Sequence, residues 1–498
     1  MRSLFNLDSP TGARIQLHIQ WIVPVVFSLA FLGYLLTQLV PSGVNGYFYL
    51  KQVKYFFETG QLYFQDRSLA FSLPFLLRYF LPKDLIAYHL SVAVLLIAFC
   101  VLQGRMALRL ANSFTSDSAP NSTAITTSLK NTFLIVLLLT VLFFTHPHIL
   151  FFGLNFYKNI FAVVFVLLGI DQHFVFTVTA KKKALAISIL AFVVAVLAHK
   201  SSLILCGAWL VAAFVFHFQK QRRFLWLVPV LLGVLIVAFL FYFPRASAYI
   251  SFLKSGFHFS TDYVLWLKSQ TRLGNFIFGG YITLVVLAGY LIASFKAATT
   301  PFRVYGVWMF CVLLFALLPI HSIGQNQLGY RWLLMSLGLS LPLVAAVCVR
   351  YRFIGGILLG LHLGQWMYAV PLHRYFLDFQ MHEAEFQQIT KFVDSEDYLI
   401  AHHGLEFYID YTTGLRARIF LPESKPANGD VFRIVHVPFG ALRWQPLRIA
   451  VNQRALLRIT REYFLLTEDQ WMEARKATIF PPESWQNPMD KNPGHVYH

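Results

Sequence analysis

Basic and imidazole side chains stand at the ends of several long apolar runs of this sequence. Lys158 and Arg331 each open a run, the pair His199-Lys200 separates two runs, and His321 lies at a similar depth. A charge at membrane depth costs about 2.5–3.5 kcal/mol on insertion scales, so it is expected to have a partner. The short segments beside these residues contain no Asp or Glu, so a phosphate or pyrophosphate is the simplest partner. The alternative is that these side chains extend to lipid head groups.

Two histidines, His146 and His148, flank Pro147 at the end of another apolar run. Because proline breaks a helix, both rings could point into a pocket and act as a general base near neutral pH. Asp66 could instead be the catalytic carboxylate. We expect no cofactor, although a divalent metal on the two histidines stays open, with only Glu58 and Asp66 to complete its shell. The alternatives are interfacial histidines bound to backbone or water, and a solvated Asp66 in a turn.

The composition indicates the kind of fold that must position these residues. Of 498 residues, 57% are hydrophobic and 13% are charged. A soluble globular protein could not cover that much apolar surface, so we expect an all-α polytopic membrane protein. The four cysteines lie in apolar runs and are expected to be buried thiols without a disulfide or a metal. A length criterion of roughly 20 residues predicts about eleven spans. Their approximate cores are 19–40, 86–103, 131–146, 158–175, 183–199, 201–217, 224–243, 276–295, 304–320, 331–349 and 353–371.

The distribution of basic residues predicts the orientation. With the N-terminus in the cytoplasm, every predicted inner loop carries Lys or Arg, as the positive-inside rule requires. The net charge of +18 is therefore spread over short loops rather than gathered in a patch, which argues against nucleic-acid binding. The first apolar run is expected to be an uncleaved anchor. We expect a bacterial inner-membrane protein whose C-terminal region lies outside the cytoplasm.

The sequence changes character after about residue 371, where charges, Pro and Gly return. We therefore predict two domains, a transmembrane domain over 1–371 and a small α/β domain over 372–498. Helices are predicted over 383–393 and 468–477, and strands over 398–401 and 431–435. The segment His402-His403-Gly404 is predicted to form a strand-to-helix turn that could touch an acceptor or be merely exposed.

The loop after the first apolar run, residues 41–85, is expected to contain amphipathic helices. An aromatic, half-basic segment predicts a helix on the outer bilayer surface that begins at Asn45 and stops at Gly60. Lys51 and Lys54 on this helix could bind an anion or extend to lipid head groups.

This loop carries a resemblance to the GT-C glycosyltransferases, polytopic enzymes that take a sugar from a polyprenyl-phosphate carrier. In those of the aminoarabinose-transferase and protein-mannosyltransferase type, an acidic residue follows the first span, then a Tyr, a helix, a Gly and a Tyr/Asp-rich stretch. Asn45, Tyr49, Gly60 and the segment Tyr63 to Asp66 stand at matching spacing. The resemblance covers about 25 residues in motif and the whole chain in architecture. It implies an inverting hexosyl- or pentosyltransferase, with Tyr49 and His321 at the substrate.

One residue departs from that pattern. The family's catalytic carboxylate corresponds to Asn45, and an amide cannot act as a general base. The next external loop also lacks an acid. Three explanations are open: another residue is the base, the protein is an inactive relative, or position 45 was deliberately changed from Asp.

Four functions are compatible with these features. The leading one moves a sugar from a polyprenyl-phosphate lipid to a glycan, lipid or protein acceptor outside the cytoplasm. The second is a lipid-linked glycan polymerase or ligase, which relies on Arg and His. The third is a catalytically degenerate subunit, or pseudoenzyme, that scaffolds a membrane-protein complex. Ion-coupled transport is disfavoured, because the predicted spans hold almost no acid near their centres.

Overall fold

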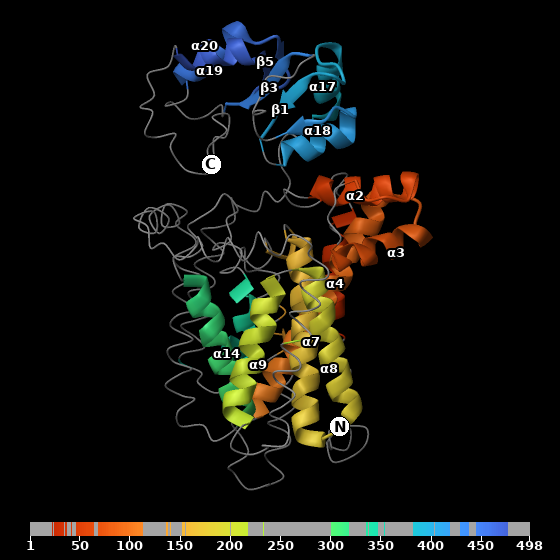
Figure 1. The fold of residues 1–498 in the computed structure, drawn as a ribbon, viewed down its shortest axis with the longest axis vertical. Helices are drawn as coiled ribbons and strands as arrows, with labels where there is room; N and C mark the ends of the chain where they lie inside the picture. The colour runs from red at the N-terminus through yellow and green to blue at the C-terminus, as the bar shows by residue number, and fades with distance from the viewer. Residues whose placement is uncertain are drawn as a thin grey trace, which may run out of the picture. The chain divides into compact units, whose positions relative to one another are not determined.

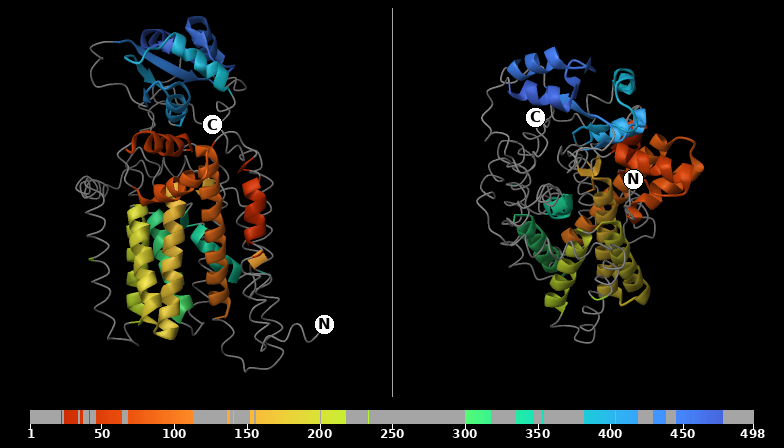
Figure 2. Two further views of the ribbon diagram at one scale, coloured as in Figure 1. Left: turned by 90° about the vertical axis from the view of Figure 1, so that its right-hand side faces the viewer. Right: turned by 45° about the horizontal axis from the view of Figure 1, so that its top comes forward.

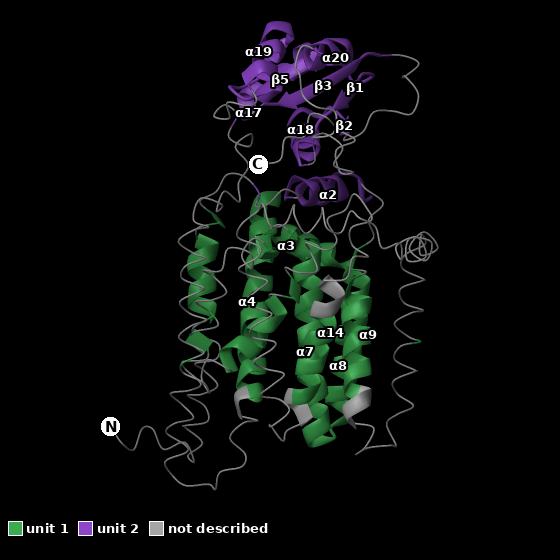
Figure 3. Cartoon of the chain, turned by 90° about the vertical axis from the view of Figure 1, so that its left-hand side faces the viewer, with its two compact units in different colours: residues 1–37, 66–323, 327–373 green, residues 38–65, 324–326, 374–498 purple. Residues whose placement is uncertain are grey.

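The computed structural model forms two compact units (Figures 1 and 3). Residues 1–37, 66–323 and 327–373 make the first unit, and residues 38–65, 324–326 and 374–498 make the second. Residues 38–65, expected with the transmembrane domain, thus group by contacts with the C-terminal part. The structure describes residues 22, 24–33, 35–36, 41, 46–63, 68–112, 136–137, 140, 152–154, 156–199, 201–217, 233, 300–317, 335–336, 338–346, 353, 382–402, 404–418, 429–437 and 445–476.

The first unit is helical in its described part (Figure 2). After a 3₁₀ turn at Leu69–Phe71, its helices include α3 Ser72–Phe80, α4 Asp84–Asn112, α7 Tyr157–Thr179, α8 Lys182–Ala198, α9 Ser201–His217 and α14 Thr300–Leu317. Residues 24–33 and 338–346 are also helical. These confirm the helices expected over 86–103, 158–175, 183–199, 201–217 and 304–320. Among the described residues, the stretches Asp84–Leu110 and Tyr157–Thr179 are long and apolar enough to cross a membrane. The predicted count of eleven spans stays a prediction, and the spans over 224–243 and 276–295 fall almost wholly outside the described residues.

Helices α7 and α8 form an antiparallel hairpin. Their turn is closed by Ala180, whose φ of 54° is left-handed and whose N–H donates to the Phe176 carbonyl over 2.7 Å. The helices approach closely at Gly169, where an added Cβ would lie 2.5 Å from the Phe192 ring. Ser188 Oγ also donates to the Gly169 carbonyl over 2.7 Å. Small residues and hydrogen bonds of this kind are what hold helices together in an apolar environment.

Helices α4 and α7 run parallel, which defines two ends of the helical unit. The rings of Tyr88 and Tyr157 lie 5.8 Å apart where both helices begin. Near the other end, the buried carboxylate of Asp171 pairs with Arg105 and Arg109, each over 2.8 Å. Since α8 returns from its turn to the first end, the start of α7 and the end of α8 lie together there.

The second unit contains a five-stranded sheet in the order β2-β1-β3-β5-β4. Strand β1 is parallel to both β2 and β3, whereas β5 is antiparallel to β3 and β4. The strands are β1 Tyr398–Ile400, β2 Ala417–Arg418, β3 Val431–His436, β4 Leu457–Arg458 and β5 Tyr463–Thr467. The helices of this unit are α2 Gly46–Thr59, α17 Glu383–Gln387 with a 3₁₀ turn to Lys391, α18 Leu405–Thr413, α19 Gln445–Arg454 and α20 Glu468–Lys476.

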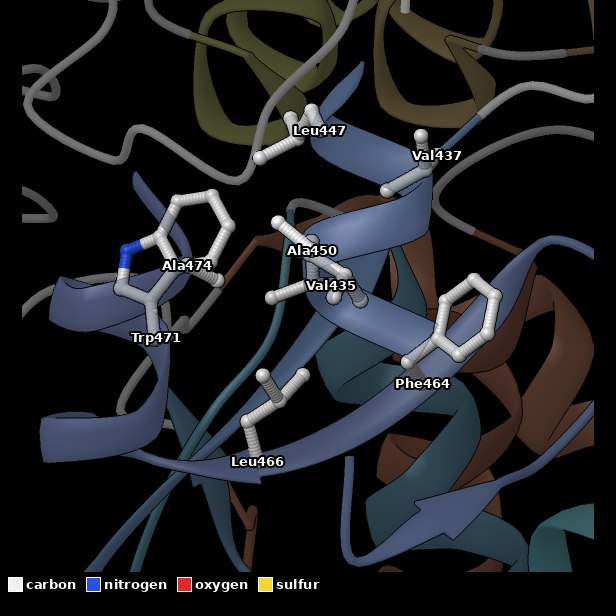
Figure 4. Packing of buried hydrophobic residues seen from close by; sticks show 9 residues of the cluster. Val435, Val437, Leu447, Ala450, Phe464, Leu466, Trp471 and Ala474 are labelled. Atoms are coloured by element: carbon white, nitrogen blue, oxygen red, sulfur yellow. The ribbon is translucent and has the colours of Figure 1, made fainter. Parts of the chain in front are cut away.

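Part of the core of this unit lies between the sheet and helices α19 and α20 (Figure 4). Phe464 and Leu466 of β5 pack there with Leu447 and with Trp471, whose side chain is fully buried. Beside them Arg433 of β3 is buried and binds Glu468 through two hydrogen bonds of 3.0 Å. Alternation along β3 and β5 thus supplies an apolar layer that two amphipathic helices cover.

The strands predicted over 398–401 and 431–435 are confirmed as β1 and β3, and the helices over 383–393 and 468–477 are confirmed as α17 with its 3₁₀ turn and as α20. The strand-to-helix turn is also confirmed, because β1 ends at Ile400 and α18 begins at Leu405 after Gly404, whose φ is 92°. Strands β2, β4 and β5 and helices α18 and α19 were not predicted from the sequence.

Candidate functional site

The predicted helix of the first loop exists as α2. It ends as expected at Gly60, whose φ is 74° and whose N–H donates to the Phe56 carbonyl over 2.8 Å. Asn45, its predicted N-cap, comes directly before Gly46, the first residue of α2. Asn45 itself lies outside the described residues. Tyr49, the predicted substrate residue, is 3% exposed.

An aromatic face of α2 packs on α18. The ring of Tyr47 lies 5.0 Å from that of Tyr408 and 5.4 Å from that of Tyr411. One residue further along α2, the ring of Phe48 lies 5.2 Å from that of Phe407. Rings at these separations and tilted angles interact favourably beyond the area they bury. Helix α2 is therefore covered by protein on this face.

Lys51 lies on the same contact and has a carboxylate partner. Its Nζ atom is 2.8 Å from Asp410 Oδ1 and donates to the Asp410 carbonyl over 3.1 Å. It also lies 4.7 Å from the centroid of the Tyr63 ring, and Lys54 lies 5.3 Å from that of Tyr411. Lys51, for which binding an anion and extending to lipid head groups were both open, instead pairs with the Asp410 carboxylate.

The phenols around this contact stay protonated to high pH. Burial raises the pKa of Tyr63 above its ordinary value, and the hydrogen bond to the Asp410 carboxylate raises it further. Burial likewise raises the pKa of Tyr47, with the neighbouring Tyr408 adding to the shift. Burial, then the charge of Glu383, raises the pKa of Tyr408. These three tyrosines are therefore neutral hydrogen-bonding groups near pH 7.

Two of the predicted phosphate ligands, Lys158 and His199, lie at the same end of the α7–α8 hairpin. Lys158 is half-buried in the first turn of α7, whose N-terminal residue Phe156 provides no side-chain cap. The N-terminus of a helix carries a positive partial charge, which favours an anion. The next residue, Asn159, donates to Met335 Sδ over 3.8 Å, and Met335 follows Arg331 by four residues in the sequence.

His199 is partly committed to a structural role. It ends α8 in an extended conformation, and its Nδ1 atom accepts the Ser201 N–H of α9 over 3.3 Å. Nδ1 is therefore an acceptor in the neutral ring, which leaves Nε2 as the atom that carries hydrogen. Only Nε2 could then donate to a ligand.

The other predicted site residues lie outside the described residues: Asn45, Asp66, His146, His148, Lys200, His321 and Arg331. Their assignments stay predictions. Among the residues that are described, no group of three or more His, Cys, Asp or Glu side chains could hold a metal ion.

His402 lies in the second unit, in a cluster of rings. The rings of His402 and His436 are 6.2 Å apart, and that of His436 stacks on Tyr463 with centroids 4.5 Å apart. His436 Nε2 is 3.2 Å from a carboxylate oxygen of Glu462. These partners agree better with a structural cluster than with an exposed turn that binds an acceptor.

Sequence reasoning missed Asp410 and Asp171, the two acids with the most consequential partners. The signal for Asp410 was its position in α18 between the aromatic residues Phe407, Tyr408 and Tyr411, at helical spacing. The signal for Asp171 was its place inside an apolar run, where an acid requires a partner.

No family model and no curated protein matches the sequence. Solved structures do match. The chain is similar to ArnT from Cupriavidus metallidurans in the apo state, with 13% identity, a TM-score of 0.55, and 90% of this chain and 97% of that chain covered. It is also similar to the same protein bound to undecaprenyl phosphate, with 12% identity, a TM-score of 0.53, and coverage of 92% and 98%. At this level of identity the likeness shows the fold alone: the chain has the fold of ArnT.

Proposed function

We propose that the protein is a membrane glycosyltransferase that moves a sugar from a polyprenyl-phosphate carrier to an acceptor outside the cytoplasm. The likeness to ArnT over 90% of the chain carries this proposal. The match to the form bound to undecaprenyl phosphate supports a polyprenyl phosphate as the lipid partner. The acceptor would be a glycan, a lipid or a protein.

The first turn of α7 supports a site for the carrier phosphate. Lys158 brings a full positive charge to an uncapped helix N-terminus, and both features favour a phosphate monoanion or dianion. His199 ends α8 at the same end of the hairpin. Lys200 follows His199, and Arg331 precedes Met335, which contacts Asn159. We assign these four basic residues to the phosphate.

The chemistry follows from the leaving group. An acceptor hydroxyl attacks the anomeric carbon while the bond from that carbon to the phosphate oxygen breaks, and the electron pair leaves with the phosphate. The configuration inverts, because the nucleophile enters opposite the leaving group. The hydroxyl proton passes to a base, for which Asp66, His146 and His148 are the candidates. The cationic residues stabilise the charge that develops on the phosphate.

The proposal also places the chain in a bacterial inner membrane, with its N-terminus in the cytoplasm and its C-terminal domain outside. Lys181, Lys182 and Lys183 support this orientation, because they lie at the start of α8, at the end of the hairpin opposite Lys158.

Native mass spectrometry of the gently solubilised protein tests the proposal. We expect a co-purified polyprenyl-phosphate species that is lost in Lys158→Ala and in Lys200→Ala/Arg331→Ala. Lys181→Ala is the matched control, because it removes an exposed lysine from the other end of the hairpin and should keep the lipid. Ordinary phospholipid in every variant would contradict the proposal.

A second candidate is a subunit that binds the lipid without transferring the sugar, and Asn45 favours it. Asn45→Asp separates the two. Sugar transfer that appears or rises in this variant would support an enzyme whose site lacks its carboxylate. Wild-type transfer that Asp66→Asn or the two histidine variants abolish would identify another base. Lipid binding with no transfer in any variant would favour the subunit.

A further inference from the structure

Helix α2 groups with the C-terminal domain although 359 residues separate its Lys51 from Asp410 (Figure 3). The segment that carries the glycosyltransferase resemblance is therefore built into the α/β unit. Any displacement of α18 within that unit would be passed to α2 through their packed faces.

The contact between α2 and α18 combines two kinds of interaction. Aromatic packing of Tyr47 and Phe48 contributes attraction between the two helices. The ion pair is directional, because Lys51 meets both the carboxylate and the backbone carbonyl of Asp410. The pair is also shielded from water, with side-chain exposures of 16% and 7%. A buried pair of this kind contributes more to a unique register than to net stability.

Asp410 is shared by a second donor from the same loop. The Tyr63 phenol hydrogen-bonds its carboxylate, and the Tyr63 ring covers the Lys51 ammonium. Lys51 is within α2, whereas Tyr63 follows Gly60, which ends the helix. Asp410 thus interacts both with the helix and with Tyr63, in the segment that follows the helix.

The beginning of α2 is equally constrained. A Cβ added at Gly46 would lie 2.7 Å from Pro41 Cβ, so the helix start packs against the segment that precedes it. Asn45 stands in the sequence between these two residues. The start of α2 is therefore held close to Pro41, while its aromatic face is held on α18.

We propose that Asp410 is a positioning residue for the active site. It holds α2, and with it Tyr49, in one register on α18. The proposal rests on the proposed function for the identity of that site. A positioning role predicts a loss in kcat, since a misplacement of about 1 Å can cost roughly 100-fold in rate.

The test compares Asp410→Asn with Asp469→Asn in the full-length protein in lipid nanodiscs. Asp469 is an exposed acid of α20 in the same unit, so the control makes the same chemical change away from α2. We expect Asp410→Asn to lower kcat roughly 10–100-fold with little change in the KM for the lipid donor, and to speed amide hydrogen exchange in α2. The control should match the wild type in all three.

A charge-swapped variant, Lys51→Asp/Asp410→Lys, separates positioning from misfolding. Each single change should speed exchange in α2, and the double variant should recover most of the protection and of kcat. Faster exchange in α2 with unchanged kcat would overturn the proposal, as would a swapped pair that recovers protection without kcat. If the wild type transfers no sugar, the proposed function fails; the exchange measurements still decide whether Asp410 sets the register of α2.

Discussion

The helical unit and the α/β unit each bury an ion site, and the two sites are built in opposite ways. In the helical unit the acid is inside: Asp171 is fully buried, while Arg105 and Arg109 are 32% and 31% exposed. In the α/β unit the base is inside: the side chain of Arg433 is 2% exposed, while that of Glu468 is 22% exposed. Both sites pair a carboxylate with guanidinium groups, but the carboxylate is the buried partner in one and the guanidinium is the buried partner in the other.

This difference determines how well each unit tolerates a substitution that removes the partner of its buried charge. A carboxylate without its partner can take up a proton and become neutral, and Asp171 has two arginines that share it. A guanidinium keeps its charge at every accessible pH, and the fork of Arg433 is matched to one carboxylate. We infer that the α/β unit depends more strongly on its outer partner than the helical unit does on either of its own.

The largest effect is expected for Glu468→Gln. This change takes the carboxylate pair from Arg433 and leaves its charge buried, which typically costs about 3–5 kcal/mol. Chemical unfolding followed by Trp471 fluorescence in the α/β unit would measure it. The control is Glu473→Gln, because Glu473 is 69% exposed and lies 3.7 Å from Arg454. Equal stability of the two variants would contradict the comparison.

An intermediate effect is expected for the two arginines of the helical unit. Arg105→Gln or Arg109→Gln alone should cost about 1 kcal/mol, because the other arginine still pairs with Asp171. The double variant should cost about 3 kcal/mol, more than the sum of the single changes, because the Asp171 carboxylate then has neither arginine. Thermal unfolding in detergent would give the coupling. Strict additivity would show that the two guanidinium groups act independently.

A smaller and pH-dependent effect is expected where α2 meets α18. Tyr47, Tyr63 and Tyr408 have raised pKa values in the folded state. Their contribution to stability is therefore fully present below the unfolded value of about 10 and is lost as the pH rises through the folded values. Exchange protection of α2 should fall above that pH, and Asp410→Asn should let Tyr63 ionise earlier. Protection that persists unchanged in strong alkali would refute this.

The smallest effect is expected for Glu385→Gln in α17. Hydrogen bonding to its own backbone N–H, then to His382, lowers the pKa of Glu385. A lowered value means that its contribution is present above the ordinary pKa and is lost as the pH falls through the folded one. Both side chains are 43% exposed, so water screens the pair. We expect no measurable change in the unfolding midpoint near pH 7, and a clear loss there would show that surface pairs matter more than this comparison assumes.

The sequence predicts what is local and misses what is distant. Apolar runs give the helices over 158–175 and 183–199 within a few residues, because length and hydropathy decide a span. Alternation gives β1 and β3. The run Tyr463 to Thr467, which forms β5, is apolar except at its end. Because it shows no alternation of apolar and polar residues, the sequence pattern could not distinguish a buried strand from a helix.

The contact between α2 and α18 could not be predicted in the same way. The basic and aromatic residues of α2 are equally suited to a lipid head-group region and to a protein surface with an acid, and only the fold selects Asp410. All ten predicted site residues remain predictions, and seven of them lie outside the described residues. Lys200 and Arg331, for example, can converge only through the packing of helices that are far apart in the sequence.

The separation of 359 residues between Lys51 and Asp410 also affects the order in which the α/β unit can assemble during synthesis. Chains are made at about 5–20 residues per second, so roughly 20–70 s pass between the synthesis of Lys51 and that of Asp410. During that interval α18, the helix that packs on the aromatic face of α2, has not yet been synthesised. A nascent chain that stops before α18 would thus contain α2 without the helix on which it packs. The packing of α2 is therefore one of the last events in the biogenesis of the protein.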